Sequence, residues 1–507
     1  MVTLALEFFL FACFRYRVVA RIFASLANAL EFNFHVPCFS TVRLWLLRLG
    51  LYRLQSASLG PRWALICDHT ATYSGQKLFV VCGVDLDQLE RRIADGKGDY
   101  NLTQSDLQPL AIVPMSHSFG EHLLRVYEQI IARHGNPQWM ITDGGSDIVK
   151  SARLLREHQE AKQQQPTQHV YDLSHRIARI VQAELLADPD WKDYEQMVTD
   201  ARMCFKYKLR QLSPPSLRHG PDRWMNLCGI VGWHTAMLEL RDKREAISQE
   251  AAERGQPAQQ NEKPRFGLTP FVWEQENESY NKPDGHYHAI EKLCGREYAD
   301  ESAYIASLVA KRPSLPEEII ETLKANSDLN EVYLKKILLG SDKVERIHNE
   351  VKGMLAFNND VQKHLKAKGL AKSEIAVCEQ MLAGAELEGV GQRVGERVLV
   401  AIKDMAANLK EGERIIVTSD IIESINGSWK IRIAGSPTPA IGGNALLMAA
   451  LMGTLSMAET KLALETVSVE AVTTWTSETF GETFHTERQK IRSKKSPPNT
   501  RENEGGI

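Results

Sequence analysis

The chain has 507 residues, 43% of them hydrophobic, which is enough to bury a substantial core in about two to four domains. Its net charge of -3 excludes an overall basic field for nucleic acid, so any such contact must come from local basic patches. The eight cysteines include no C-x-x-C pair, which argues against zinc ribbons and disulfide scaffolds and indicates a reducing cytoplasm.

The N-terminal segment, residues 1–56, is predicted to be helical. The apolar run at 8–14 has no preceding positive residue and is too short to span a bilayer, so it predicts a buried first helix without membrane insertion. Residues 16–30 and 41–54 show helical apolar spacing on either side of a turn. With Arg43 and Arg48 on the second helix, this pattern predicts a helix-turn-helix-like DNA-binding segment. An ordinary helical hairpin is the alternative.

From residue 60 the pattern changes to short apolar runs, which predict strands. The five runs are WALICD (63–68), KLFVVCGVDL (77–86), LAIVPM (110–115), WMITD (139–143) and HVYDLSH (169–175). Helices are predicted at 116–135, closed by Gly135, at 146–159 and at 176–186. The order β-β-β-α-β-α-β-α predicts an α/β fold in which residues 60–184 form the first part of an RNase H-like mixed sheet core.

The remainder is predicted to be mostly helical. Residues 185–410 form an all-α insertion, interrupted by a polar linker at 249–264 and containing amphipathic helices from 313 to 412. Residues 411–470 supply the last part of the core, with a buried core helix in 440–458. The basic, proline-bearing tail 486–507 is expected to be disordered.

Three acidic residues stand in distinctive contexts. Asp68 and Asp143 end apolar runs, and Glu423 lies in a helix-like segment, TSDIIESINGSWK. Carboxylates from two strands and a packed helix can together bind two divalent cations, Mg²⁺ or Mn²⁺. Two such cations can catalyse the cleavage and joining of phosphodiester bonds. Asp420, three residues before Glu423, is the alternative for the third position.

The motifs CDHTATYSGQKLFVVCGVDL, ITDGGSDIVKS, YDLSHRIARIV and SDIIESINGSWK together resemble the DDE transposases of bacterial insertion sequences. The resemblance covers roughly residues 15–200 and 411–460 of this chain. It implies an RNase H-like core in which Asp68, Asp143 and Glu423 form the metal-binding catalytic triad. Some of these families carry a large insertion before the Glu, which fits the spacing 423 - 143 = 280 residues. Lys430 resembles a Lys that follows the Glu in one large group, although the Tyr and Arg that precede the Glu there are absent here.

The D-x-x-H element, Asp172 to His175, resembles a marker of some insertion-bearing families. Both residues are therefore expected at the edge of the active site, where His175 could donate to a DNA phosphate or orient a carboxylate. The alternative is that Asp172 simply caps the following helix.

Two further groups are candidate sites. His286, His288 and Cys294 could bind zinc, but no fourth ligand and no common spacing accompany them. A basic stretch interleaved with aromatics could hold phosphates and stack on a base, or could be a solvated helix face with a buried tryptophan. Its members are Lys206, Tyr207, Lys208, Arg210, Arg218, Arg223 and Trp224.

These observations predict a cytoplasmic, nucleoid-associated transposase that acts as a homodimer or higher oligomer on DNA, with no membrane partner. It would bind terminal inverted repeats, cleave at the ends of its element and join the 3′ hydroxyls to target DNA. A catalytically inactive or domesticated DNA-binding relative is the alternative. An RNase H-type nuclease acting on RNA–DNA hybrids is a third class, but it needs neither a helical insertion nor an end-recognition module.

Overall fold

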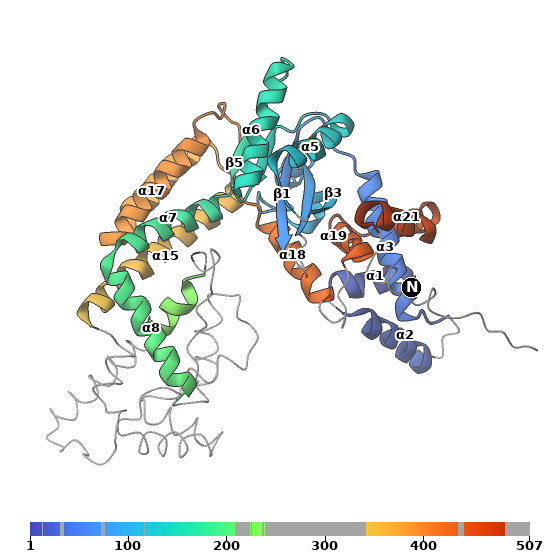
Figure 1. Ribbon diagram of the computed structural model, residues 1–507, viewed down its shortest axis with the longest axis horizontal. Coiled ribbons are helices and arrows are strands. Elements are labelled where there is room, and N and C mark those ends of the chain that lie inside the picture. The colour runs from blue at the N-terminus through green and yellow to red at the C-terminus, as the bar shows by residue number, and fades with distance from the viewer. Residues whose placement is uncertain are drawn as a thin grey trace, which may run out of the picture. The chain divides into compact units, whose positions relative to one another are not determined.

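The computed structural model describes residues 1–12, 14–30, 35–71, 77–115, 117–207, 224, 226–235, 238, 341–433 and 441–481 (Figure 1). These form two compact units. The first consists of the described residues within Met1–Asp172, Leu365–Leu370 and Arg414–Ile507, and the second of those within Leu173–His364 and Ala371–Glu413. No helix in the described part of the chain has the length and apolarity needed to cross a membrane.

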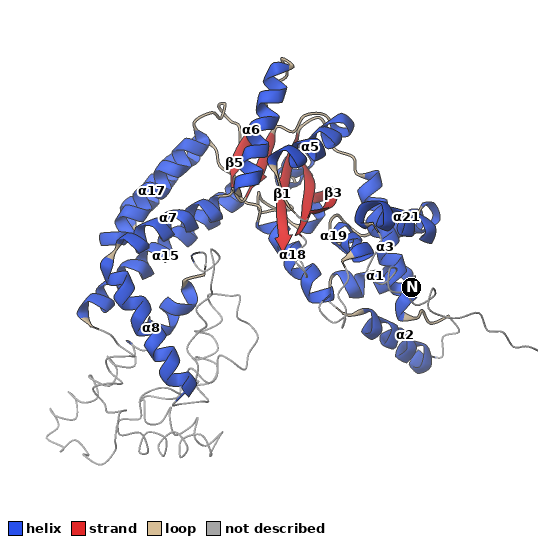
Figure 2. Ribbon diagram, in the orientation of Figure 1, coloured by secondary structure: helices blue, strands red, loops and turns tan. Residues whose placement is uncertain are grey.

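A mixed five-stranded sheet lies at the centre of the first unit (Figure 2). Its strands are β1 (Trp63–Ala71), β2 (Lys77–Asp85), β3 (Leu107–Met115), β4 (Trp139–Thr142) and β5 (Gln168–Tyr171), in the spatial order β3-β2-β1-β4-β5. The pairs β1–β2 and β2–β3 are antiparallel, whereas β1–β4 and β4–β5 are parallel. The five predicted strands and the α/β class are therefore confirmed.

The helices α5 (Gly120–His134) and α6 (Ser146–Ala161) cover one face of this sheet. Their apolar side chains pack against the odd-numbered residues of β1 in a buried cluster, whose largest members are Trp63, Leu65, Phe79, Leu123, Tyr127, Ile148 and Leu155. Gly135 closes α5 in a left-handed conformation with φ 78°, as predicted. Because side chains alternate along a strand, the even-numbered Asp68 points to the opposite face.

The sequence pattern missed the helix α4 (Leu86–Ala94), which follows β2 directly. It has only nine residues, and its N-cap is the last residue of the strand: Asp85 accepts a hydrogen bond from the backbone N–H of Gln88 at 2.9 Å. The apolar residues at the junction suit a strand as well as a helix, so periodicity alone does not separate the two.

The N-terminal helices pack against the C-terminal ones within the first unit. They are α1 (Val2–Leu10), α2 (Tyr16–Leu30) and α3 (Phe39–Ser56), and the C-terminal elements are η4 (Gly442–Ala445), α19 (Leu446–Ala450), α20 (Met457–Thr466) and α21 (Val469–Phe480). The buried core segment within 440–458 is as predicted, whereas the first helix covers only the beginning of the apolar run at 8–14, and Phe11 and Phe14 are exposed. The helices α3 and α19 approach so closely that a Cβ on Gly50 would lie 2.0 Å from the carbonyl oxygen of Leu446.

This packing corrects the DNA-binding interpretation of residues 1–56. No side chain from 41 to 54 is exposed, so α3 has no open face with which to enter a DNA groove. The Nε of Arg43 donates to Asn444 Oδ1 at 3.1 Å, and Arg48 donates to the carbonyl oxygens of Leu464 and Val467. Both arginines hold the helices of this unit together, as the packing alternative predicts.

The second unit contains α7 (Leu173–Ala187), α8 (Pro189–Tyr207), α16 (Lys372–Gly384), α17 (Gly389–Ala406) and most of α15 (Asp342–Lys368). The predicted helical character of 185–410 holds for its described residues. The boundary between the two units falls at Asp172, however, and not at the expected residue 184, because α7 packs against α17.

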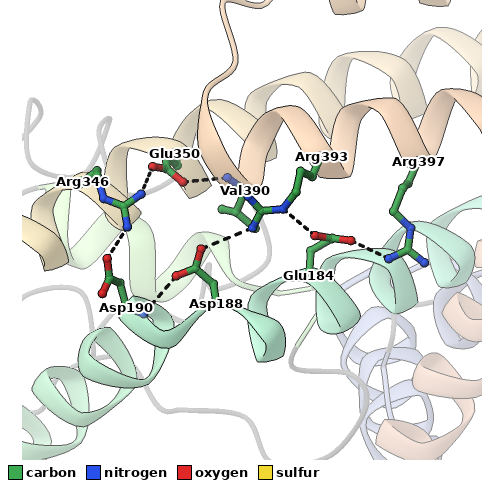
Figure 3. A network of polar contacts seen from close by, with 8 residues as sticks. All are labelled: Glu184, Asp188, Asp190, Arg346, Glu350, Val390, Arg393 and Arg397. Carbon is green, nitrogen blue, oxygen red and sulfur yellow. Dashed lines mark hydrogen bonds and ion pairs between the residues drawn. The ribbon is translucent and has the colours of Figure 1, made fainter.

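A chain of ion pairs joins four segments of the second unit (Figure 3). Arg393 and Arg397 of α17 both contact Glu184 of α7, at 2.9 and 2.7 Å, and Arg346 of α15 bridges Asp190 and Glu350. Burial opposes ionisation of Glu184, but the two arginines outweigh it and lower its pKa. Exposed pairs contribute little individually, so this network orients the helices and leaves most of the stabilisation to the apolar core.

A buried histidine makes the stability of the second unit depend on pH. His348 is 1% exposed, its Nε2 lies 3.2 Å from Thr235 Oγ1, and its Nδ1 lies 3.4 Å from Tyr194 Oη. The Thr235 hydroxyl donates to the Val231 carbonyl, so it accepts from a neutral His348 ring that is protonated on Nε2. Burial, followed by the nearby His234, lowers the pKa of His348 to about 3.

We predict that the second unit loses stability as the pH falls from 6.5 towards about 3. The unfolded chain binds a proton at His348 near its ordinary pKa, whereas the folded chain resists protonation, so acid favours unfolding. Each pKa unit corresponds to about 1.4 kcal/mol, giving a loss of a few kcal/mol. Urea unfolding followed by tryptophan fluorescence at several pH values measures this slope. His348→Gln should flatten it, and an unchanged slope in that variant would assign the pH dependence to other groups.

Candidate active site

Two of the three predicted carboxylates lie on or directly after neighbouring parallel strands, Asp68 on β1 and Asp143 one residue beyond β4. Cys67 of β1 pairs with Thr142 of β4, so continuing the register by one residue places Asp68 beside Asp143. Adjacent strands are about 4.8 Å apart, and residues paired across them point to the same face of the sheet. The first two members of the triad are therefore neighbours, although 143 - 68 = 75 residues separate them in sequence.

The helix α18 (Asp420–Ile433), which carries the third predicted carboxylate, packs against β1. Its contact with the acidic pair is made by Asn426, whose Nδ2 donates to Asp68 Oδ2 at 2.8 Å. Glu423 lies one turn earlier, about 60° around the helix from Asn426, and is exposed. The structure thus brings the helix that carries Glu423 to the strand that bears Asp68, and the role of Glu423 stays a prediction.

The alternative third ligand, Asp420, has a different partner. Its carboxylate forms an ion pair with Lys366, and it lies about 120° around α18 from Asn426. Glu423 therefore lies nearer than Asp420 to the helix face that contacts Asp68. The contacts favour Glu423 for the third position.

Asp172 is a buried positioning residue, and this corrects its expected catalytic role. It is 0% exposed, and its Oδ2 accepts hydrogen bonds from both the backbone N–H and the hydroxyl of Ser419, the latter at 2.8 Å. Its own N–H donates to the Thr142 carbonyl at 2.8 Å, which fixes it to the end of β4. Because Ser419 immediately precedes α18, Asp172 anchors the start of that helix.

The loop that carries Asp143 is held by its glycines. Gly144 has φ 77°, and a Cβ there would lie 1.4 Å from Cε2 of Tyr171, so the tyrosine ring packs directly on the backbone. The N–H of Gly145 donates to Asp143 Oδ1 at 2.9 Å. The sequence D-G-G therefore fixes the direction of the Asp143 carboxylate as well as the turn.

On the opposite face of β1, His69 ties the same loop to the sheet. Its Nε2 lies 2.9 Å from Asp147 Oδ2 and 3.1 Å from Ser118 Oγ. Burial lowers the pKa of His69 despite the neighbouring Asp147, which favours the neutral ring. Burial opposes ionisation of Asp147, but the hydrogen bond from Ser118 and the His69 contact outweigh it and lower its pKa. Both contacts involve one ring nitrogen, so the group lacks the relay geometry of a Ser-His-Asp hydrolase.

The negative charges of the acidic pair raise the pKa values of neighbouring cysteine thiols. The pKa of the Cys67 thiol is raised well above its ordinary value, first by burial and also by the charges of Asp68 and Asp143. The thiol of Cys82 is affected similarly, by burial and by Asp68. Neither cysteine is a nucleophile or a metal ligand in this environment, because both are held as buried neutral thiols.

The donor set suits a hard divalent cation. It offers carboxylate oxygens from Asp68, Asp143 and Glu423 and a nearby amide oxygen on Asn426, which are the ligand types that Mg²⁺ and Mn²⁺ prefer. In the described part of the chain, no three His, Cys, Asp or Glu side chains stand together closely enough to hold a metal ion. Closing the set requires a rotamer change at the exposed Glu423, and like-charge repulsion favours the more open arrangement without a cation.

The other predicted site residues have varied outcomes. Trp224 is 3% exposed and packs 6.1 Å from the ring of Trp191, which corrects its assignment as a base-stacking residue in favour of the buried-tryptophan alternative. Lys430 is exposed, on the same face of α18 as Glu423. His175 lies on α7 in the second unit, so its role near the carboxylates stays a prediction. The remaining candidates lie outside the residues or side chains that the structure describes: Lys206, Lys208, Arg210, Arg218, Arg223, His286, His288 and Cys294.

Sequence reasoning missed three residues of this site: Asn426, Ser419 and His69. The spacing offered a signal for Asn426, because a residue three positions after Glu423 lies on the same side of a helix. Ser419 precedes a predicted helix, where hydroxyl side chains are frequent, but nothing in the sequence connects it to Asp172. In comparisons with known proteins, no protein-family model and no curated protein matches the chain.

We predict that Gly144→Ala destabilises the first unit by more than about 2 kcal/mol, because it adds a clash with Tyr171 to an unfavourable backbone conformation. Gly427→Ala is the matched control: Gly427 lies on α18 with open space around its Cα, so alanine should stabilise by up to about 1 kcal/mol. Urea unfolding of both variants measures the difference. Equal stability of the two would contradict the packing of Tyr171 on the loop.

A double-mutant cycle tests the anchor at the start of α18. Asp172→Asn and Ser419→Ala should each destabilise the first unit, and their effects should be non-additive by about 1–3 kcal/mol, the range for a buried hydrogen bond to a charged group. Chemical unfolding of the wild type, the two single variants and the double variant gives the coupling. Purely additive effects would show that Asp172 does not hold Ser419.

Proposed function

We propose that the chain is a metal-dependent DDE transposase, a polynucleotidyl transferase that cleaves at the ends of a mobile DNA element and joins the 3′ hydroxyls to target DNA. One observation carries the proposal: the register of β1 and β4 places Asp68 beside Asp143, the residue directly after β4, and the helix that bears Glu423 packs onto β1 and contacts Asp68. These three carboxylates come from segments that are distant in sequence. Convergence of three such carboxylates on two cations is the arrangement that two-metal phosphoryl transfer requires.

The sheet supports the finer assignment to an RNase H-like core. Three antiparallel strands are followed by two that pair in parallel, with β1 in the middle and its acidic residue facing α18. Most described residues between β5 and α18 lie in the second unit, which supports an insertion into this core. Both features agree with the resemblance to insertion-bearing DDE transposases.

Some residues of the proposed site would bind the cations, and others hold the cation-binding residues in place. Two Mg²⁺ or Mn²⁺ ions bound by Asp68, Asp143 and Glu423 would activate the attacking oxygen and stabilise the leaving oxygen of the phosphodiester. Gly145 orients Asp143, and Asp172 fixes the start of α18 through Ser419. Lys430, two turns after Glu423 and exposed on the same face, is suited to a DNA phosphate.

The proposed partners are double-stranded DNA with terminal inverted repeats and a target DNA, bound by a homodimer or a higher oligomer. The proposed location is the cytoplasm, in association with the nucleoid. Because α3 is buried, recognition of the element ends must rely on other surfaces than Arg43 and Arg48. The exposed face of α18 is the described surface nearest to the proposed chemistry.

We predict that Asp68→Asn, Asp143→Asn and Glu423→Gln each reduce Mg²⁺-dependent strand cleavage by at least about a hundredfold, because losing a ligand costs more than disturbing an outer-shell contact. A supercoiled plasmid carrying the gene with its flanking genomic DNA serves as substrate, and excision and strand transfer are measured on gels. Asp420→Asn is the matched control, since it removes a carboxylate from the same helix that pairs with Lys366.

Four outcomes of this experiment are informative. Cleavage by the wild type that disappears in the three variants but survives in Asp420→Asn supports the transposase. DNA binding without cleavage under any divalent cation favours the inactive, domesticated relative. Cleavage confined to RNA–DNA hybrids favours a nuclease of RNase H type. Cleavage that survives Glu423→Gln and disappears in Asp420→Asn would move the third ligand to Asp420.

A further inference from the structure

The inference concerns Asn426 and rests on the proposed function. Asn426 is 5% exposed, lies on α18 one turn after Glu423, and donates from Nδ2 to Asp68 Oδ2 at 2.8 Å. A carboxylate accepts hydrogen bonds and does not donate them, so the NH₂ end of the amide must face Asp68. The contact therefore fixes the orientation of both side chains.

The other end of this amide lacks a partner. Asn426 Oδ1 is buried and accepts no hydrogen bond from any described residue. It cannot exchange ends with Nδ2, because an oxygen facing the Asp68 carboxylate would be repelled. A buried amide oxygen beside an acidic pair is a strong acceptor, and buried acceptors are normally satisfied by protein, water or an ion-bound group. The oxygen thus marks a place for a donor that this chain does not supply.

We propose that Asn426 is a positioning residue of the acidic site, which holds the Asp68 carboxylate in one orientation through Nδ2 and accepts, through Oδ1, a hydrogen bond from the hydration shell of a divalent cation. Small divalent cations such as Mg²⁺ keep several waters when proteins bind them, and each such water is a strong donor. A residue that hydrogen-bonds to a metal ligand orients that ligand. It therefore changes the affinity for the metal without contacting the metal itself.

The neutral amide is the side chain that suits this position. A carboxylate at 426 would be repelled by Asp68 when no cation is present, and an apolar side chain would leave Asp68 without its donor. Asn supplies one donor and one acceptor without adding charge. The substitutions Asn426→Ala and Asn426→Asp therefore both remove the donor to Asp68, but only the second adds a negative charge that a bound cation would neutralise.

The experiment measures Mn²⁺ binding to the full chain without DNA, by isothermal titration calorimetry. Asn426→Ala should weaken Mn²⁺ binding by about 10- to 100-fold, the range for loss of an outer-shell partner. Ser424→Ala is the matched control, an exposed position on the same helix, and should bind as the wild type does. Wild-type affinity in folded Asn426→Ala would overturn the inference.

A second measurement decides the matter if Asn426→Ala does not fold. In Asn426→Asp the added carboxylate repels Asp68, so Mn²⁺ should raise the melting temperature more than it does in the wild type. A rise equal to that of the wild type would overturn the inference. Failure of the proposed function is distinguishable: the wild type would then bind no Mn²⁺, or Asp68→Ala would leave Mn²⁺ binding unchanged.

Discussion

Like charges on Asp68 and Asp143 repel, so the fold must supply the free energy that keeps them side by side. The β1–β4 ladder holds the two backbones in register, and the Asp68 and Asp143 carboxylates accept hydrogen bonds from neutral donors, Asn426 Nδ2 and the Gly145 N–H respectively. Donors of this kind stabilise the charged form without cancelling its charge. The rest of the first unit, including the loop glycines and the packing of α18, positions these two hydrogen-bond donors.

The second constraint is that the chain leaves the first unit for the long second unit and must then return to the first. Asp172 is the last residue before the second unit, and Ser419 lies shortly after the chain re-enters the first unit at Arg414. Their hydrogen bonds, with the backbone pairing of Leu370 and Ile415, close this excursion at its base. The entropy of closing a loop grows only slowly with its length, so a fixed base tolerates a large insertion. Glu423 is thereby placed by contacts at the base of the insertion.

The sheet and its two aspartates could be predicted from the sequence because short apolar runs define strands, and parallel strands bring their C-terminal ends together. Position 423 could be chosen only through a family resemblance, since no local pattern connects α18 to β1. The interpretations of α3 and Trp224 were wrong for one reason. An amphipathic or basic pattern predicts that one face of a helix is buried or polar. It does not predict which other segment of the chain packs against that face. Arg43 and Trp224 are covered by Asn444 and Trp191, from other parts of the chain.

Some arginines of the first unit act as internal donors. Arg53 donates to the carbonyl oxygens of Ala450 and Thr454 and pairs with Glu459, and Arg432 donates to those of Phe9 and Leu10. Such an arginine cannot also neutralise a phosphate without breaking these bonds, and the planar guanidinium suits this clamping role. If the chain binds DNA as proposed, the salt-dependent part of the affinity therefore falls to solvent-facing cations such as Lys430. The positive charges that hold the fold and those proposed to contact DNA would then be separate sets, so the proposed DNA binding does not require a net positive charge on the chain.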